Sequence, residues 1–94
     1  MGNRKRENPN GPRRVYVVAL RGGDVYVGQT ALSPEERYRQ HKRGGMGTSR
    51  DVQERGIGVV GTAGPYYSEE AAEQAERETA RALRRAGVRV LGGH

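Results

Sequence analysis

Two short apolar runs near the start of the chain predict a β-hairpin. Residues 15–20 and 25–28 are rich in β-branched and aromatic side chains, and the segment 21–24 between them holds two glycines and an aspartate. Apolar runs joined by such turn-forming residues are typical of paired antiparallel strands. A further apolar run at 57–60, interrupted by one glycine, predicts a third strand.

Start and stop signals predict two helices after the hairpin. Ser33, followed by a proline and two glutamates, is a typical N-cap, and the glycines after Arg43 end that helix. Ser68 precedes an acidic first turn, and the long helix that it begins ends at Gly87. Between these two helices, residues 49–55 could form only a short helix.

The order of these elements predicts an α+β fold with a small central three-stranded antiparallel sheet flanked by helices. An extended piece over 88–91 closes the chain. The 94 residues are too few for two hydrophobic cores, so we expect a single domain over 15–94, preceded by a basic tail over 1–14. That tail is either a floppy terminus or an arm that follows a phosphate backbone.

Composition excludes several classes of chemistry and favours one class of partner. The chain has no cysteine, which removes disulfides, thiol catalysis and cysteine zinc sites, and its two histidines, His41 and His94, are far apart in the sequence. Seventeen lysines and arginines against eleven acidic residues give a net charge of +6, which favours nucleic acid as a partner, although a merely solvated basic surface is the alternative. With no apolar segment long enough for a bilayer and no secretory signal, we expect a cytoplasmic protein without membrane contact.

The long helix carries one carboxylate that core packing does not explain. Six residues share the spacing of one inward stripe, and Glu76 lies on it; the six are Ala72, Ala75, Thr79, Ala82, Leu83 and Ala86. Glu73 and Glu78 each have an arginine three or four residues ahead, as in an outer face of salt bridges. A carboxylate turned toward an apolar interior needs a partner such as a divalent cation, unless it lies half-exposed at the rim of the stripe.

Three kinds of polar side chain elsewhere also stand out. Arg37 and His41 are four residues apart and therefore project from one face of the first helix, where they form either a phosphate-facing pair or an ordinary solvated surface. Tyr16 and Tyr26 lie on the two strands of the predicted hairpin, so their phenols can be close together. Each tyrosine taken alone is accounted for as a good strand-former.

Taken in order, these residues resemble the GIY-YIG endonuclease superfamily. The first signature corresponds to residues 14–16, which keep only the tyrosine, and the second is nearly intact as Tyr-Val-Gly at 26–28. Arg37 and His41 follow on the next helix and Glu76 on a later one, so the resemblance spans residues 15 to about 92. The chain departs from the family at Arg14, which replaces a glycine, and at its end, where many relatives carry an asparagine.

The resemblance implies hydrolysis of DNA phosphodiester bonds with Mg²⁺ or Mn²⁺ as cofactor. It implies that Glu76 is the sole protein ligand of the metal and that Arg37 stabilises charge on the scissile phosphate. Tyr16 is then the expected general base, with Tyr26 and His41 positioning or deprotonating the attacking water. Which of these groups takes the proton is left open by the sequence.

The expected DNA contacts are mostly basic. They are Arg4, Lys5, Arg6, Arg13, Arg14, Lys42, Arg43 and Arg50, together with Gly28, which leaves room beside the site. Backbone contacts of this kind do not read base sequence, so specificity would come from a homodimer or a partner protein. The alternative is a nucleic-acid-binding module or accessory subunit with the same fold and little cleavage activity, and a structural protein of a ribosome-like or phage-like particle is a third possibility.

Overall fold

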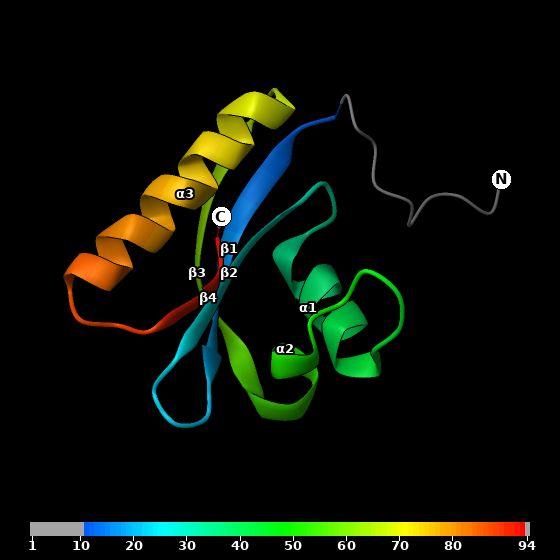
Figure 1. Ribbon diagram of the computed structural model, residues 1–94. Helices are drawn as coiled ribbons and strands as arrows, with labels where there is room; N and C mark the ends of the chain where they lie inside the picture. The colour runs from blue at the N-terminus through cyan, green and yellow to red at the C-terminus, as the bar shows by residue number, and fades with distance from the viewer. Residues whose placement is uncertain (1–10, 94) are drawn as a thin grey trace, which may run out of the picture.

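A computed structural model describes residues 11–93 and gives an α+β fold built on one mixed sheet (Figure 1). The strands are β1 (Arg13–Leu20), β2 (Val25–Thr30), β3 (Gly56–Tyr66) and β4 (Val90–Gly92). The helices are α1 (Pro34–Arg43), α2 (Arg50–Arg55) and α3 (Glu69–Arg85). Three predicted DNA contacts, Arg4, Lys5 and Arg6, and the terminal His94 lie outside the described residues.

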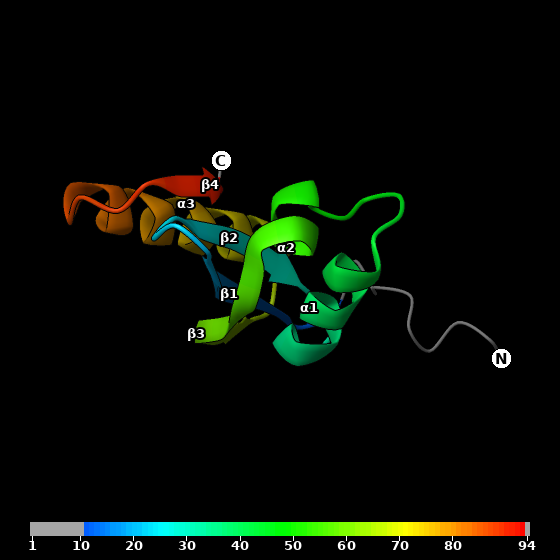
Figure 2. The same cartoon turned by 90° about the horizontal axis from the view of Figure 1, so that it is seen from below.

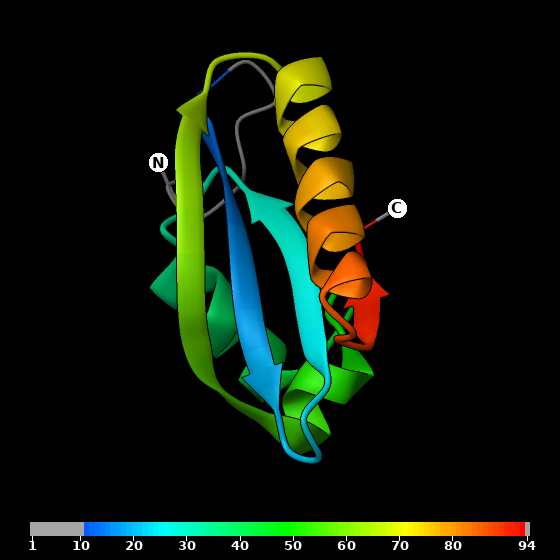
Figure 3. The same ribbon diagram turned by 90° about the vertical axis from the view of Figure 1, so that its left-hand side faces the viewer.

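The sheet has four strands in the order β3-β1-β2-β4, so the prediction of three antiparallel strands was incomplete. β1 pairs antiparallel with both β2 and β3, as expected for the hairpin and the third strand. The extended piece near the end of the chain adds β4 parallel to β2, opposite residues 25–27 only. Figure 3 shows β3, β1 and β2 side by side, with α3 running along the β2 side. The outer edge of β2 is therefore covered over its first half.

Two boundaries and one helix face also differ from the predictions. β1 begins at Arg13, so the last two residues of the predicted tail belong to the sheet, and β3 continues to Tyr66. In α3 the fully buried side chains are Ala72 and Ala80, whereas Ala82 and Ala86 of the predicted inward stripe are exposed. The predicted stripe advances by about 3.5 residues per turn, whereas an α-helix needs about 3.6. Its last positions therefore rotate away from the sheet.

All three helices begin at a serine cap, of which the sequence predicts two, Ser33 and Ser68. Ser33, Ser49 and Ser68 each accept a hydrogen bond from a backbone N–H three residues ahead, which satisfies a donor that the first helical turn leaves unpaired. Within residues 11–93, no helix has both the length and the apolar character needed to cross a bilayer.

Each face of the sheet has its own small core. On one face, Val15 and Val27 pack with Ala80 of α3 and Val90 of β4. On the other face, Tyr16, Val18 and Leu20 pack with Val52 of α2, and Tyr26 and Tyr38 lie against this cluster. Figure 2, seen from below, shows α1 and α2 on the opposite side of the strands from α3. Alternation along β1 and β2 thus sends neighbouring residues to two different helical layers.

Val52 tests this assignment of the core. Its side chain is 0% exposed and fastens the short helix α2 to the sheet, so Val52→Ala is expected to lower the free energy of unfolding by about 2 kcal/mol through lost burial and an internal cavity. Ile57, a larger apolar residue that is 64% exposed, is the matched control, and Ile57→Ala is expected to change stability by less than about 0.5 kcal/mol. Urea denaturation of both variants makes the comparison, and equal losses would contradict the packing described.

Candidate active site

The centre of the candidate site is a hydrogen-bonded pair between β1 and α1. The phenol oxygen of Tyr16 lies 2.8 Å from Nε2 of His41, and the two side chains are 1% and 0% exposed. The other ring nitrogen of His41, Nδ1, accepts a hydrogen bond of 2.8 Å from the backbone N–H of Ser49. The loop between α1 and α2 is therefore fastened to the imidazole.

This arrangement decides where the proton of His41 lies. A backbone N–H can only donate, so Nδ1 carries no hydrogen, and the neutral imidazole holds its proton on Nε2. The Nε2–H group therefore donates to the oxygen of Tyr16. Burial, together with the nearby Arg37 guanidinium, lowers the pKa of His41 from 6.5 to about 4, so the neutral form is the one present at neutral pH.

Tyr26 extends this chain of hydrogen bonds toward solvent. Its ring meets His41 edge-on at a centroid distance of 5.4 Å, and its phenol is hydrogen-bonded to Tyr16. Because the Tyr16 oxygen accepts the hydrogen bond from Nε2–H of His41, its own hydroxyl donates to Tyr26. Unlike Tyr16, Tyr26 is only half-buried.

Two opposite charges act on the phenol of Tyr26. Burial raises the pKa of Tyr26 above its ordinary value of 10, the Arg37 guanidinium opposes this rise, the Glu76 carboxylate adds to it, and the hydrogen bond from Tyr16 opposes it. Arg37 and Glu76 come from α1 and α3, which lie on different sides of the sheet. Tyr26 is thus in ring contact with Tyr16 and His41 and within electrostatic range of Arg37 and Glu76, the other four predicted catalytic residues.

Arg37 is held in place by the same loop that fastens His41. Its Nη1 donates to the side chain of Gln40 at 2.7 Å, and its Nη2 donates to the backbone oxygen of Gly47 at 2.5 Å. The guanidinium is half-buried, and this reduces the screening of its charge by water. Loop residues 44–49 therefore position both Arg37 and His41.

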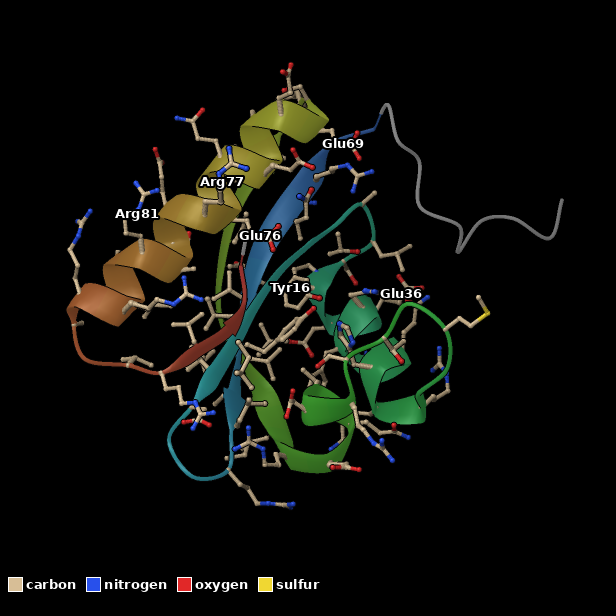
Figure 4. The ribbon with its side chains drawn as sticks, in the orientation of Figure 1. Tyr16, Glu36, Glu69, Glu76, Arg77 and Arg81 are labelled. Atoms are coloured by element: carbon tan, nitrogen blue, oxygen red, sulfur yellow. The ribbon has the colours of Figure 1, made fainter. Side chains whose placement is uncertain are left out.

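Glu76 reaches the site past the open edge of β2, and Figure 4 shows it on the sheet side of α3. Its Oε1 accepts a hydrogen bond of 3.1 Å from Nε2 of Gln29, a residue that strand alternation turns toward α3. These two residues, with Glu73 and Arg77, line a pocket of about 170 Å³. β4 pairs with β2 only as far as Val27, so this pocket lies where the parallel strand has ended.

The pocket offers oxygen atoms to a hard cation. Besides Glu76 it is lined by Gln29, whose Oε1 is a buried atom that no donor reaches within residues 11–93. Mg²⁺ prefers oxygen ligands and keeps several of its waters, so one carboxylate and one amide oxygen fit such an ion. Over the same described range, no group of three or more histidine, cysteine or acidic side chains could hold a metal.

Sequence reasoning did not single out Gln29 or Ser49. Gln29 could have been found from alternation, because it lies two residues after Val27 on the same strand face as the core that packs on α3. Ser49 acts through its backbone N–H, and no side-chain pattern signals such a contact.

The predicted DNA contacts are divided by the structure. Arg14, Arg43 and Arg50 are exposed, although Arg50 pairs with Glu54 at 3.2 Å. Arg13 is buried and lies 3.8 Å from the carboxylate of Glu69, because the strand begins earlier than predicted.

Lys42 and Gly28 have packing roles in the structure. The ammonium of Lys42 donates to the backbone oxygens of Gln53 and Gly56 at 3.0 and 3.1 Å, where it caps the end of α2. Gly28 is buried, and its missing side chain makes room for the phenol of Tyr16.

Gly28 tests the close packing of the two phenols. A Cβ at this position would lie 2.7 Å from the Tyr16 oxygen and 3.0 Å from Cε2 of Tyr26. We expect Gly28→Ala to displace the phenol pair and to cost about 1–3 kcal/mol in unfolding free energy. Gly58→Ala is the matched control, since a Cβ there meets nothing within 4 Å. Denaturant unfolding measures the stability of both variants. A Gly28→Ala protein as stable as wild type would contradict this geometry.

His41 predicts the pH dependence of stability. The pKa of His41 is about 4 in the folded protein and 6.5 in the unfolded chain, so the unfolded chain binds more protons between these two pH values. Stability therefore falls as pH decreases through this window. The whole window is worth about 3 kcal/mol, and the loss is complete below about pH 4. The slope of unfolding free energy against pH should be smaller in His41→Asn, because this variant lacks the His41 contribution. All other titrating groups are common to both proteins and cancel in the comparison. Equal slopes would contradict the prediction.

Comparison with known proteins leaves the chain without an assigned relative. No protein-family model, no curated protein and no solved structure matches it. What these side chains do is therefore inferred from their own geometry and from the resemblance of the motifs that carry them.

Proposed function

We propose that this protein is a divalent-metal-dependent endonuclease that hydrolyses phosphodiester bonds of DNA, as the GIY-YIG resemblance implies. The observation that carries the proposal is the position of Tyr26, within electrostatic reach of both Arg37 and Glu76 and hydrogen-bonded to Tyr16. Hydrolysis of a phosphodiester requires a group that removes a proton from water, positive charge for the transition state, and commonly a metal ion. One side chain for each requirement is present around this phenol.

Glu76 is the side chain that would hold the metal, with Oε1 of Gln29 as a second oxygen ligand. The hydrogen bond from Gln29 to Glu76 orients the carboxylate, in the manner of groups that support metal ligands. When bound, Mg²⁺ or Mn²⁺ supplies positive charge that polarises a phosphate oxygen and offsets the carboxylate charge that raises the pKa of Tyr26.

Arg37 supplies fixed positive charge for the phosphate. Its guanidinium is already anchored by Gln40 and the Gly47 backbone, so it need not be ordered when charge develops on the phosphate oxygens. Removing one such preorganised donor costs roughly 3–4 kcal/mol in other enzymes, which corresponds to about two to three decades in rate.

Tyr26 is the better placed of the two phenols to take the proton of the attacking water. Sequence reasoning favoured Tyr16, but Tyr16 is 1% exposed and lies between His41 and Tyr26. Tyr26 is half-buried, and although burial and the Glu76 carboxylate raise its pKa, the Arg37 guanidinium and the hydrogen bond from Tyr16 favour its anionic form. A metal ion bound at Glu76 would offset the carboxylate charge. We therefore assign the general base to Tyr26 and a positioning role to Tyr16 and His41.

The alternative proposal is a nucleic-acid-binding protein with the same fold and basic charge that does not cleave DNA. A nucleic-acid-binding module or accessory subunit would use the same exposed arginines without needing Tyr26, Arg37 and Glu76 to converge. A nicking assay separates the two proposals, because only the nuclease requires a divalent ion and these three side chains.

Nicking of supercoiled plasmid DNA tests the nuclease proposal. We expect wild-type protein to nick in Mg²⁺ or Mn²⁺ and not in EDTA. Glu76→Gln and Arg37→Gln are expected to lower the rate about 10²- to 10³-fold. Tyr26→Phe is expected to lower it about 10²- to 10⁴-fold, as for loss of a general base, and Tyr16→Phe to lower it less.

Glu70→Gln is the matched control for the metal site, because Glu70 is an exposed carboxylate on the same helix. It should nick at the wild-type rate. Binding without nicking in either metal ion would favour the binding module. Nicking by Glu76→Gln at the wild-type rate would contradict the metal site directly.

A further inference from the structure

Some lysine and arginine side chains of this protein bind to other groups of the chain, and others project into solvent. Arg55 pairs with Asp24 and Asp51, Arg21 donates to the backbone of Glu54, and Lys42 caps α2. Each of these positive charges already has an internal partner. Such residues stabilise loops and helix ends, and they are poorly placed to bind a second molecule.

The second half of α3 holds cations of the other kind. Arg77, Arg81 and Arg85 follow one another at intervals of four residues and are exposed, so they form one ridge along the helix. No hydrogen bond or ion pair engages any of the three within residues 11–93. Figure 4 shows Arg81 on the outer side of α3, away from the sheet.

Acidic residues within reach do not neutralise this ridge. Glu73 and Glu78 are spaced to form salt bridges with Arg77 and Arg81, and the sequence predicts these pairs. Neither pair forms in the described part of the chain, and Glu78 instead accepts a hydrogen bond of 3.2 Å from Gln74. The prediction of an outer face of salt bridges on α3 was therefore wrong. Three guanidinium groups remain available on one line.

The ridge begins at the pocket of the candidate active site. Arg77 lines that pocket together with Gln29, Glu73 and Glu76. Acidic residues fill the first half of α3, and from Arg77 onward arginines predominate. A polyanion approaching Glu76 would therefore be repelled by the start of the helix and attracted along its second half.

We propose that Arg77, Arg81 and Arg85 bind phosphates of one DNA strand on one side of the cleavage site. Eight residues of α-helix span about 12 Å, and phosphates follow one another by about 3.4 Å along the axis for each strand, so the ridge covers about three of them. Guanidinium groups bind phosphate through two parallel hydrogen bonds, which suits this role. The choice of DNA as the polyanion rests on the proposed function.

The salt dependence of DNA binding tests the ridge without any need for cleavage. A short fluorescent duplex is titrated with wild-type and variant protein in EDTA over a series of salt concentrations. Each lost phosphate contact reduces the slope of log K against log salt by about 0.9. Arg81→Gln should therefore make the slope less negative by about 0.9, and the double variant Arg81→Gln/Arg85→Gln by about 1.8.

Arg39→Gln is the matched control, because it removes the same charge from an exposed position on α1. Arg39 lies on the side of that helix opposite Arg37 and His41, so it faces away from the site, and its slope should equal that of wild type. Equal changes in Arg81→Gln and Arg39→Gln, or a wild-type slope in the double variant, would overturn the proposal. Loss of slope in the ridge variants together with a failed nicking assay would reject the nuclease and leave the DNA-binding ridge standing.

Discussion

The buried hydrogen bond between Tyr16 and His41 is the contact on which the rest of the site depends. It joins β1 to α1, and the second nitrogen of the same imidazole holds the loop before α2 through Ser49. A buried polar pair is stable only when its members are satisfied, and here each has the partner it needs. The neutral state of His41 follows from this enclosure, and it sets the direction of the hydrogen bonds that end at Tyr26.

The site also depends on the place where the parallel strand β4 ends. β4 covers β2 as far as Val27, and the following residues of β2 leave an open edge beside α3. Alternation turns Gln29 toward α3 and Tyr26 toward α1, so groups from both faces of the sheet meet around one edge. An arginine from one helical layer and a carboxylate from the other can therefore act on the same phenol.

The strands β1, β2 and β3 and the three helices follow from local chemistry. Serine caps, turn glycines and apolar runs act over a few residues, so the positions of the helices and of the hairpin could be predicted closely. β4 could not be placed, because three residues carry no signal of the partner they will choose. The burial of Arg13 was missed for a similar reason, since a strand boundary decided by tertiary pairing lies inside a basic segment.

The sequence by itself determined which chemical groups are available: two phenols on a hairpin, an arginine and a histidine one turn apart, and one glutamate on an inward stripe. These spacings act along a single strand or helix, so they can be deduced from helical and strand periodicity. Only the tertiary structure decided which phenol is buried, which nitrogen of His41 carries the proton, and which arginines have no acidic partner among residues 11–93. Such properties depend on distances between elements far apart in the chain, and local periodicity holds no information about them.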